Sequence, residues 1–142
     1  MRMRQLFAAI LCLIGSAPAA AGTTPVNGTV VDTQGYEGVA AIAQLGAVTA
    51  TGVPTLKLQQ GDLADGSDMA DIVGAVAVGN DTMSGKCLGV EVHLPTKRYV
   101  RPVLIRATAN TALNSILVQL FNASHTPVTQ TDAAGAVSII GP

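Results

Sequence analysis

The sequence has 142 residues, with 8 basic and 9 acidic side chains and a formal net charge of −1. This charge balance excludes a generally basic nucleic-acid-binding protein. Hydrophobic residues make up 49% of the chain, aromatic residues only 3% and charged residues 12%, against about 25% charged residues in an average soluble domain. Two cysteines are too few for a disulfide-dense scaffold or a four-cysteine zinc site. We expect one domain with much of its surface facing other protein.

The N-terminal segment fits two interpretations. Met1–Gln5 carries two arginines, Leu6–Ile14 is a short apolar run, and Gly15–Gly22 is rich in small residues and contains Ala-x-Ala. These are the three parts of a secretory signal peptide, and the apolar run is too short to span a bilayer of about 30 Å. The alternative is a retained arm that packs on a partner. In either case we predict an N-terminal segment over residues 1–24 and a folded domain over 25–142.

The rest of the chain predicts strands separated by turns. Clean alternation places Leu88, Val90, Val92 and Leu94 on an inner face. Residues 36–45 are nearly apolar on both faces, as in a strand covered on two sides. Pro102 predicts an edge strand or a bulge. Predicted strands cover 25–32, 36–45, 55–60, 86–94, 97–109, 112–122 and 136–140, while Ile72–Val78 fits either a strand or one helical turn. The fold class is therefore all-β, an antiparallel sandwich or jelly-roll-like domain.

Candidate catalytic residues are scarce. The only histidines are His93 and His125, and no serine or cysteine lies in a nucleophile motif such as Gly-x-Ser-x-Gly. We predict a non-enzymatic protein with no cofactor. Cys12 and Cys87 are expected to be isolated buried thiols; a disulfide between them would require an oxidising compartment and a retained N-terminus.

Charged residues cluster in two places. The loop Gly61–Asp71 contains Asp62, Asp65 and Asp68, whose oxygens suit Ca²⁺, but their spacing does not match an EF-hand. We therefore expect a solvated turn closed by Asx hydrogen bonds and no metal site. The basic cluster is too small for a DNA-binding face and is expected to form salt bridges with a partner or with the acidic loop. Its members are Lys97, Arg98, Arg101 and Arg106.

Three fragments in fixed order carry a resemblance to a known family. They are Asn-Gly-Thr-Val-Val-Asp-Thr-Gln-Gly-Tyr-Glu-Gly (27–38), Leu-Lys-Leu-Gln-Gln-Gly-Asp continuing through Asp-Gly-Ser-Asp-Met-Ala-Asp-Ile (56–72), and Lys-Arg-Tyr-Val-Arg (97–101). Over roughly residues 5–120 the chain resembles small tailed-bacteriophage head proteins regarded as capsid decoration or head-stabilising proteins. The chain departs from the family in two residues inserted after Asp62 and in a C-terminus without a basic tail.

The resemblance implies a structural virion protein that binds the major capsid protein, with no nucleic-acid or membrane partner. It also implies that residues 1–24 form an arm without export, and it favours a homotrimer. The interface candidates on the arm are Leu6, Phe7, Ile10 and Leu11. Because aromatic residues are so few, Tyr36 and Tyr99 are expected to be anchors, together with Arg98 and Arg101, and Arg101 can fork onto Asp32 or Asp62. The alternative function is a secreted or periplasmic β-sandwich binding module with a cleaved signal peptide.

Overall fold

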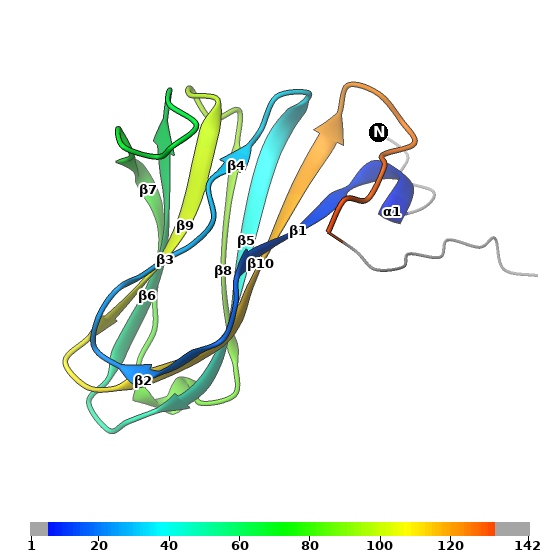
Figure 1. Ribbon diagram of the computed structural model, residues 1–142. Coiled ribbons are helices and arrows are strands. Elements are labelled where there is room, and N and C mark those ends of the chain that lie inside the picture. The colour runs from blue at the N-terminus through cyan, green and yellow to red at the C-terminus, as the bar shows by residue number, and fades with distance from the viewer. Residues whose placement is uncertain (1–5, 133–142) are drawn as a thin grey trace, which may run out of the picture.

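Two antiparallel five-stranded sheets pack face to face in the computed structural model, which describes residues 6–132 (Figure 1). The first sheet has the order β1-β10-β5-β8, with β2 also paired to β10, and the second has the order β3-β9-β6-β7, with β4 also paired to β9. This confirms the predicted all-β sandwich. The elements are α1 (Leu6–Ala9), β1 (Leu11–Ser16), β2 (Ala19–Gly22), β3 (Val26–Asn27), β4 (Val31–Asp32), β5 (Tyr36–Val48), β6 (Val53–Gly61), β7 (Ala70–Val78), the 3₁₀ turn η1 (Asp81–Met83), β8 (Cys87–His93), β9 (Tyr99–Ala107) and β10 (Thr111–Ala123).

The core lies between the two sheets and consists of aliphatic side chains. Period-two alternation turns every second residue of each long strand inward, so Val39, Ala41 and Ala43 of β5 are fully buried. The opposite face of β5, with Ala40 and Ile42, is only partly covered. The expectation that this strand is covered on both sides is therefore wrong, because the second sheet packs on one face alone. The other fully buried core residues include Leu45, Leu56, Leu58, Leu104, Leu113, Ile116, Val118 and Leu120.

Residues 70–78 form a strand, β7, and not a helical turn. Its register with β6 shifts between Lys57 and Gln59, and Gly74 at that shift has a φ of +83°. A glycine suits this bulge because other residues are strained at positive φ. The predicted inner face of β8 is correct for Leu88, Val90 and Val92. It fails for Leu94, which is 61% exposed and leaves the strand with a φ of +56°.

Pro102 lies on an interior strand, contrary to the prediction of an edge or a bulge. β9 has β6 on one side, in continuous register, and the short strands β3 and β4 on the other. The carbonyl of Pro102 accepts a hydrogen bond from the amide of Gly28, in the gap between β3 and β4. The N–H and C=O of one residue in an antiparallel strand point to the same neighbour. The missing N–H of Pro102 therefore faces this gap, and no bond to β6 is lost.

The N-terminal segment is part of the sandwich from Leu11 onward. β1 pairs with β10 over five residue pairs, from Leu11 opposite Leu120 to Ser16 opposite Ile116. Ile10 is buried and Leu11 packs against the core, so these two interface candidates are already covered within the chain. The predicted boundary after residue 24 does not coincide with a break in the first sheet. The physical reason is that β10 would otherwise carry an open apolar edge, which β1 and β2 cover.

The remaining expectations concern the thiols, the helix and the C-terminus. Cys12 is partly buried and Cys87 is exposed, and both are free. The expectation of a buried thiol is wrong for Cys87, because side chains alternate along β8 and the next residue, Leu88, takes the inner face. Among the described residues, no helix is long and apolar enough to cross a membrane. The strand predicted at 136–140 lies outside the described residues.

Candidate functional site

The three fragments that carry the family resemblance meet at one end of the second sheet. Tyr99, the first residue of β9, pairs with Asp32 of β4 on one side and with Gly61 of β6 on the other. The turn before β9 and the acidic loop after β6 therefore emerge side by side. We call this end of the sheet, with Asp32, the segment 59–68 and the segment 96–101, the polar end.

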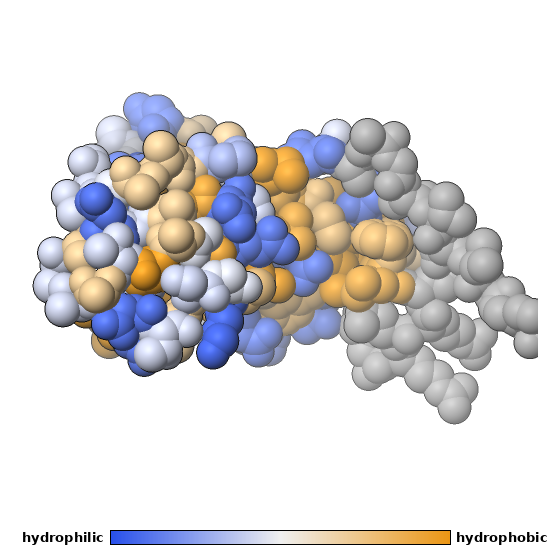
Figure 2. Space-filling view, turned by 90° about the horizontal axis from the view of Figure 1, so that it is seen from below, coloured by the Kyte–Doolittle hydropathy of each residue, from blue (hydrophilic) through white to orange (hydrophobic). Residues whose placement is uncertain are grey.

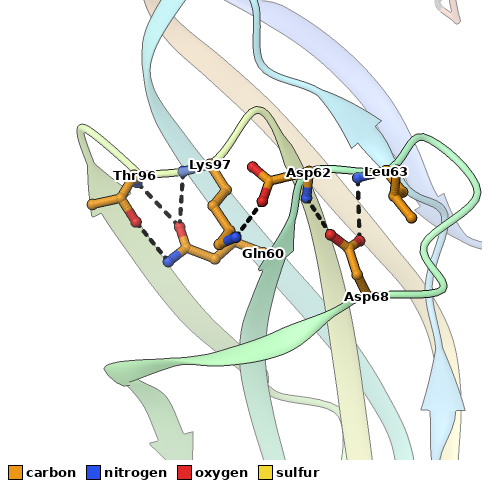
Figure 3. A network of polar contacts seen from close by, with 6 residues as sticks. All are labelled: Gln60, Asp62, Leu63, Asp68, Thr96 and Lys97. Atoms are coloured by element: carbon orange, nitrogen blue, oxygen red, sulfur yellow. Dashed lines mark hydrogen bonds and ion pairs between the residues drawn. The ribbon is translucent and has the colours of Figure 1, made fainter.

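Gln60 and Lys97 fasten the two loops of the polar end to each other (Figure 3). The side-chain carbonyl of Gln60 accepts hydrogen bonds from the amides of Thr96 at 3.1 Å and Lys97 at 3.3 Å, and its amide group donates to the Thr96 hydroxyl at 2.9 Å. The ammonium group of Lys97 forms an ion pair with Asp62, which raises the pKa of Lys97 through the hydrogen bond and the charge of that carboxylate. The predicted salt bridge between the basic cluster and the acidic loop is therefore present.

Two other carboxylates of the acidic loop close its turns. Asp68 accepts hydrogen bonds from the amides of Asp62 at 2.7 Å and Leu63 at 3.2 Å. Asp65 accepts from the amide and the hydroxyl of Ser67 at 2.9 and 2.8 Å. The Asp65 bonds are the expected Asx-type bonds, whereas Asp68 closes the loop by bonding amides that precede it in the chain. Among residues 6–132, no group of three or more histidine, cysteine, aspartate or glutamate side chains is placed to hold a metal ion.

Arg98, and not Arg101, takes the carboxylate of Asp32. Arg98 donates to both Asp32 oxygens, at 2.9 and 2.7 Å, in a bidentate pair. Its guanidinium also lies 5.2 Å from the centre of the Tyr99 ring. Arg101 donates instead to the side-chain carbonyl of Gln59 at 3.1 and 2.6 Å. The prediction for Arg101 fails because the strand register places Gln59 directly opposite it.

Arg106 lies in the interior, at the opposite end of β9, and contacts no carboxylate among the described residues. It is 8% exposed and donates to the carbonyls of Thr24 at 2.7 Å, Ala20 at 2.6 Å and Thr111 at 3.0 Å. The prediction of a salt bridge is wrong for this residue. Its inward direction does follow from the sequence, because Arg106 alternates in phase with Val100 and Leu104, which are buried.

The two tyrosines and the histidines lie near the surface. Tyr36 packs against the core, and burial raises its pKa; Tyr99 is half-buried. His93 and Glu37 form an exposed pair with 3.6 Å between nitrogen and oxygen, and His125 is exposed. Two open hollows of about 510 and 400 Å³ lie at the ends of β5 and β10, and neither lining contains a histidine or a cysteine.

The carboxylates of the sandwich predict a loss of stability in acid. Hydrogen bonds from Arg98 lower the pKa of Asp32, hydrogen bonds from Lys57 and Gln59 lower that of Asp71, and the Asp62 amide lowers that of Asp68. Each carboxylate stabilises the fold fully above its ordinary pKa of 3.8, and this contribution disappears as the pH falls through the lower folded-state pKa. The melting temperature should therefore fall as the pH drops below that value.

Thermal unfolding followed from neutral to strongly acidic pH measures this effect. Asp32→Asn should flatten the acid limb of the curve, whereas Glu91→Gln, on the exposed side of β8, is the matched control. If the melting temperature of Asp32→Asn falls with pH as steeply as that of the unaltered protein, the Arg98–Asp32 pair is not a source of the acid sensitivity.

Comparison with known proteins gives a likeness of fold. No protein-family model and no curated protein matches the sequence. Among solved structures, the chain is similar to the crystal structure of PBSX exported protein XepA, with a TM-score of 0.56 and 17% sequence identity. The match covers 93% of this chain and 43% of that chain, so this chain spans less than half the length of XepA. At this identity the likeness establishes the β-sandwich architecture and no more.

Proposed function

We propose that this protein is a non-enzymatic structural protein of a tailed-bacteriophage head, which decorates the capsid by binding its major capsid protein as a homotrimer. The observation that carries the proposal is the polar end. The three fragments that resemble the head-protein family are far apart in the sequence, yet Arg98 pairs with Asp32 and Lys97 with Asp62. The fold therefore brings the three fragments together at one end of the second sheet, as expected if they form a single structural unit. The fold likeness to a protein of the phage PBSX also supports a phage association.

The outer face of the first sheet supports an adhesive mechanism. Strand register places Ile14, Leu117 and Ile42 in one row across β1, β10 and β5. Ile14 is 53% exposed and the other two are partly exposed. Figure 2 shows that hydrophobic residues gather on the side of the molecule toward α1 and β1. Burying apolar surface contributes about 25 cal/mol of favourable free energy per Å². This face can therefore bind a capsid surface by apolar burial alone.

Helix α1 adds exposed apolar residues next to the outer face of the first sheet. Leu6 and Phe7 of α1 are 43% and 37% exposed, and the neighbouring Ala9 lines a hollow with Ala40 and Phe121 on the outer face of the first sheet. Of the four interface candidates on the N-terminal segment, these two remain available to a partner. We place the capsid contact on the Ile14 row together with Leu6 and Phe7.

An exported binding module is the second candidate function. The signal-like composition of residues 1–22 favours it, and the similar PBSX protein is described as exported. Against it stands the pairing of β1 and β2 with β10, because cleavage near residue 22 would remove both strands and open the β10 edge. Intact-mass analysis separates the two: a mass near 14.3 kDa supports the virion protein, and the loss of about two dozen residues supports export.

Co-sedimentation with isolated capsids that lack decoration tests the proposed function. The protein should bind saturably and raise the temperature at which the capsids disassemble. Ile14→Lys should weaken binding at least tenfold, since a charge on this face would have to be desolvated. Leu63→Lys, at a residue 51% exposed in the acidic loop, is the matched control and should bind normally. Absence of binding by the unaltered protein would refute the proposal, and equal binding by both variants would refute the chosen face.

A further inference from the structure

The edges of the two sheets differ in how they are protected against strand addition. On the outer edge of β1, the Gln130 side chain accepts from the Cys12 amide at 3.0 Å and Asp132 accepts from the Ile14 amide at 2.9 Å. The edge strands β3 and β4 have two residues each, and β8 carries the exposed polar side chains of Glu91 and His93. Short strands and charged side chains are established ways to block edge pairing.

β7 is neither short nor charged along residues 72–78, and its one irregularity is the bulge at Gly74. It is nine residues long, and within residues 6–132 no strand pairs with its outer edge. Its exposed valines are Val73 at 98%, Val76 at 50% and Val78 at 64%. Its one charged residue, Asp71, is bound by Lys57 at 2.8 Å and by Gln59 at 2.8 Å. Residues 72–78 carry no charge and expose three valines, and an apolar edge of this kind is a site for an added strand.

The main-chain groups that would accept this strand can be identified. The amide of Gly79 donates to the carbonyl of Pro54 in β6. Main-chain groups alternate in direction along a strand, so those of Ala77, which pairs with Leu56, face β6. The N–H and C=O of Val76 and Val78 face away from β6 and form the open edge.

The chain also contains a segment suited to pair with this edge. Residues 133–142, Ala-Ala-Gly-Ala-Val-Ser-Ile-Ile-Gly-Pro, contain no charged residue. Within them, Ala136–Ile140 has four apolar residues of five, three of them β-branched, which favours a strand. The other segment outside the described residues, Met1–Gln5, carries two arginines and suits an uncharged edge less well.

This segment cannot reach β7 of its own chain. Asp132 is held on β1, and only three residues separate it from Ala136, a reach of about 14 Å. β1 and β8 are opposite edges of the first sheet, three strand spacings or about 14 Å apart. β7 contacts β8 but belongs to the second sheet, and Figure 1 shows it on the side of the molecule away from β1. Because packed sheets are about 10 Å apart, β7 is roughly 17 Å or more from β1. The strand that β7 accepts must therefore come from another molecule.

We infer that residues Ala136–Ile140 of one copy add as a strand to the outer edge of β7 in a second copy. The donor segment follows Asp132, which is held on β1, and the acceptor β7 is the edge strand of the other sheet, so donor and acceptor are different surfaces and the contact joins copies head to tail. Head-to-tail contacts close into rings when the rotation between neighbours permits, and a ring of three is the trimer proposed above. The contact joins copies of this chain and does not depend on capsid binding.

Complementation between two full-length variants tests the inference by sedimentation velocity. Val76→Pro removes an outward N–H while leaving the β6–β7 bonds intact, so it disables the acceptor. Ile139→Asp combined with Ile140→Asp disables the donor without altering any residue of the sandwich. Each variant alone should be monomeric. An equimolar mixture should form a 1:1 dimer, because one variant supplies an intact β7 and the other an intact C-terminal segment.

The matched control is Val76→Ala, which keeps the N–H and should assemble like the unaltered protein. The inference is overturned if the unaltered protein is monomeric, or if the donor variant keeps its full oligomeric state. It is also overturned if the mixture of the two variants remains monomeric. If Val76→Pro loses assembly while the donor variant still assembles, β7 pairs with β7 of another copy and the inference is overturned. Circular dichroism shows whether Val76→Pro is folded. If Val76→Pro is not folded, the oligomeric state of the donor variant by itself decides the outcome.

Discussion

Replacing Arg106 by alanine should lower the free energy of unfolding by about 2–4 kcal/mol. The guanidinium bonds three carbonyls, those of Ala20, Thr24 and Thr111, and Thr111 is fully buried. A buried carbonyl left without a partner costs about 1–3 kcal/mol, and the lost packing of the side chain adds to this. Arg106 also links β9 to β2 and β10, so the loss should loosen the N-terminal strands from the sandwich.

Urea denaturation measures the change, and two variants locate its cause. Arg106→Met keeps most of the apolar stem, so the difference between methionine and alanine separates packing from hydrogen bonding. Arg101→Ala is the control on the same strand, because Arg101 is only partly buried and donates to a single side-chain carbonyl. Equal losses for Arg106→Ala and Arg101→Ala would show that the three carbonyls do not depend on Arg106.

Substituting Gly28 by alanine should destabilise the protein by about 1–3 kcal/mol, the usual cost of overpacking. A Cβ atom at this position would lie 2.6 Å from the carbonyl oxygen of Gly15, 2.8 Å from that of Pro102 and 2.7 Å from the Pro102 ring. Gly15 belongs to the first sheet and Pro102 to the second. Since two of these atoms are backbone, the clash can be relieved only by moving strands of both sheets.

Gly89→Ala is the matched control, because Gly89 lies in β8 and its nearest heavy atom would be 4.0 Å from the new Cβ. Alanine in a strand is favoured over glycine by roughly 0.5–1 kcal/mol, so this variant should be neutral or slightly more stable. Thermal melting of the two variants in parallel gives the comparison. A Gly28→Ala protein as stable as Gly89→Ala would contradict the close approach of the two sheets at this point.

The sequence by itself determined the strands β5, β6, β8, β9 and β10, because the alternation of side chains is a local property of extended backbone. The alternation in β8 correctly identified the inner residues Leu88, Val90 and Val92, whereas the salt bridge expected for Arg106 was wrong because that side chain points inward. The turns of the acidic loop were also predictable, since Asp65 and Asp68 bond to amides only a few residues away. The opposite charges of the basic cluster and the acidic loop indicated that these two segments meet, as the Lys97–Asp62 pair shows.

Only the tertiary structure decided the partners that lie far apart in the chain. Gln59 is opposite Arg101, 42 residues away, and the register of β6 against β9 that sets this pairing is not encoded in either strand alone. The N-terminal apolar run shows the same limit. Its composition fits a signal peptide or an arm, and it became the edge strand β1 because β10, more than 100 residues later, offers an apolar edge. Local propensity fixes which residues can be strands, whereas burial of the remaining apolar surface decides which strands meet.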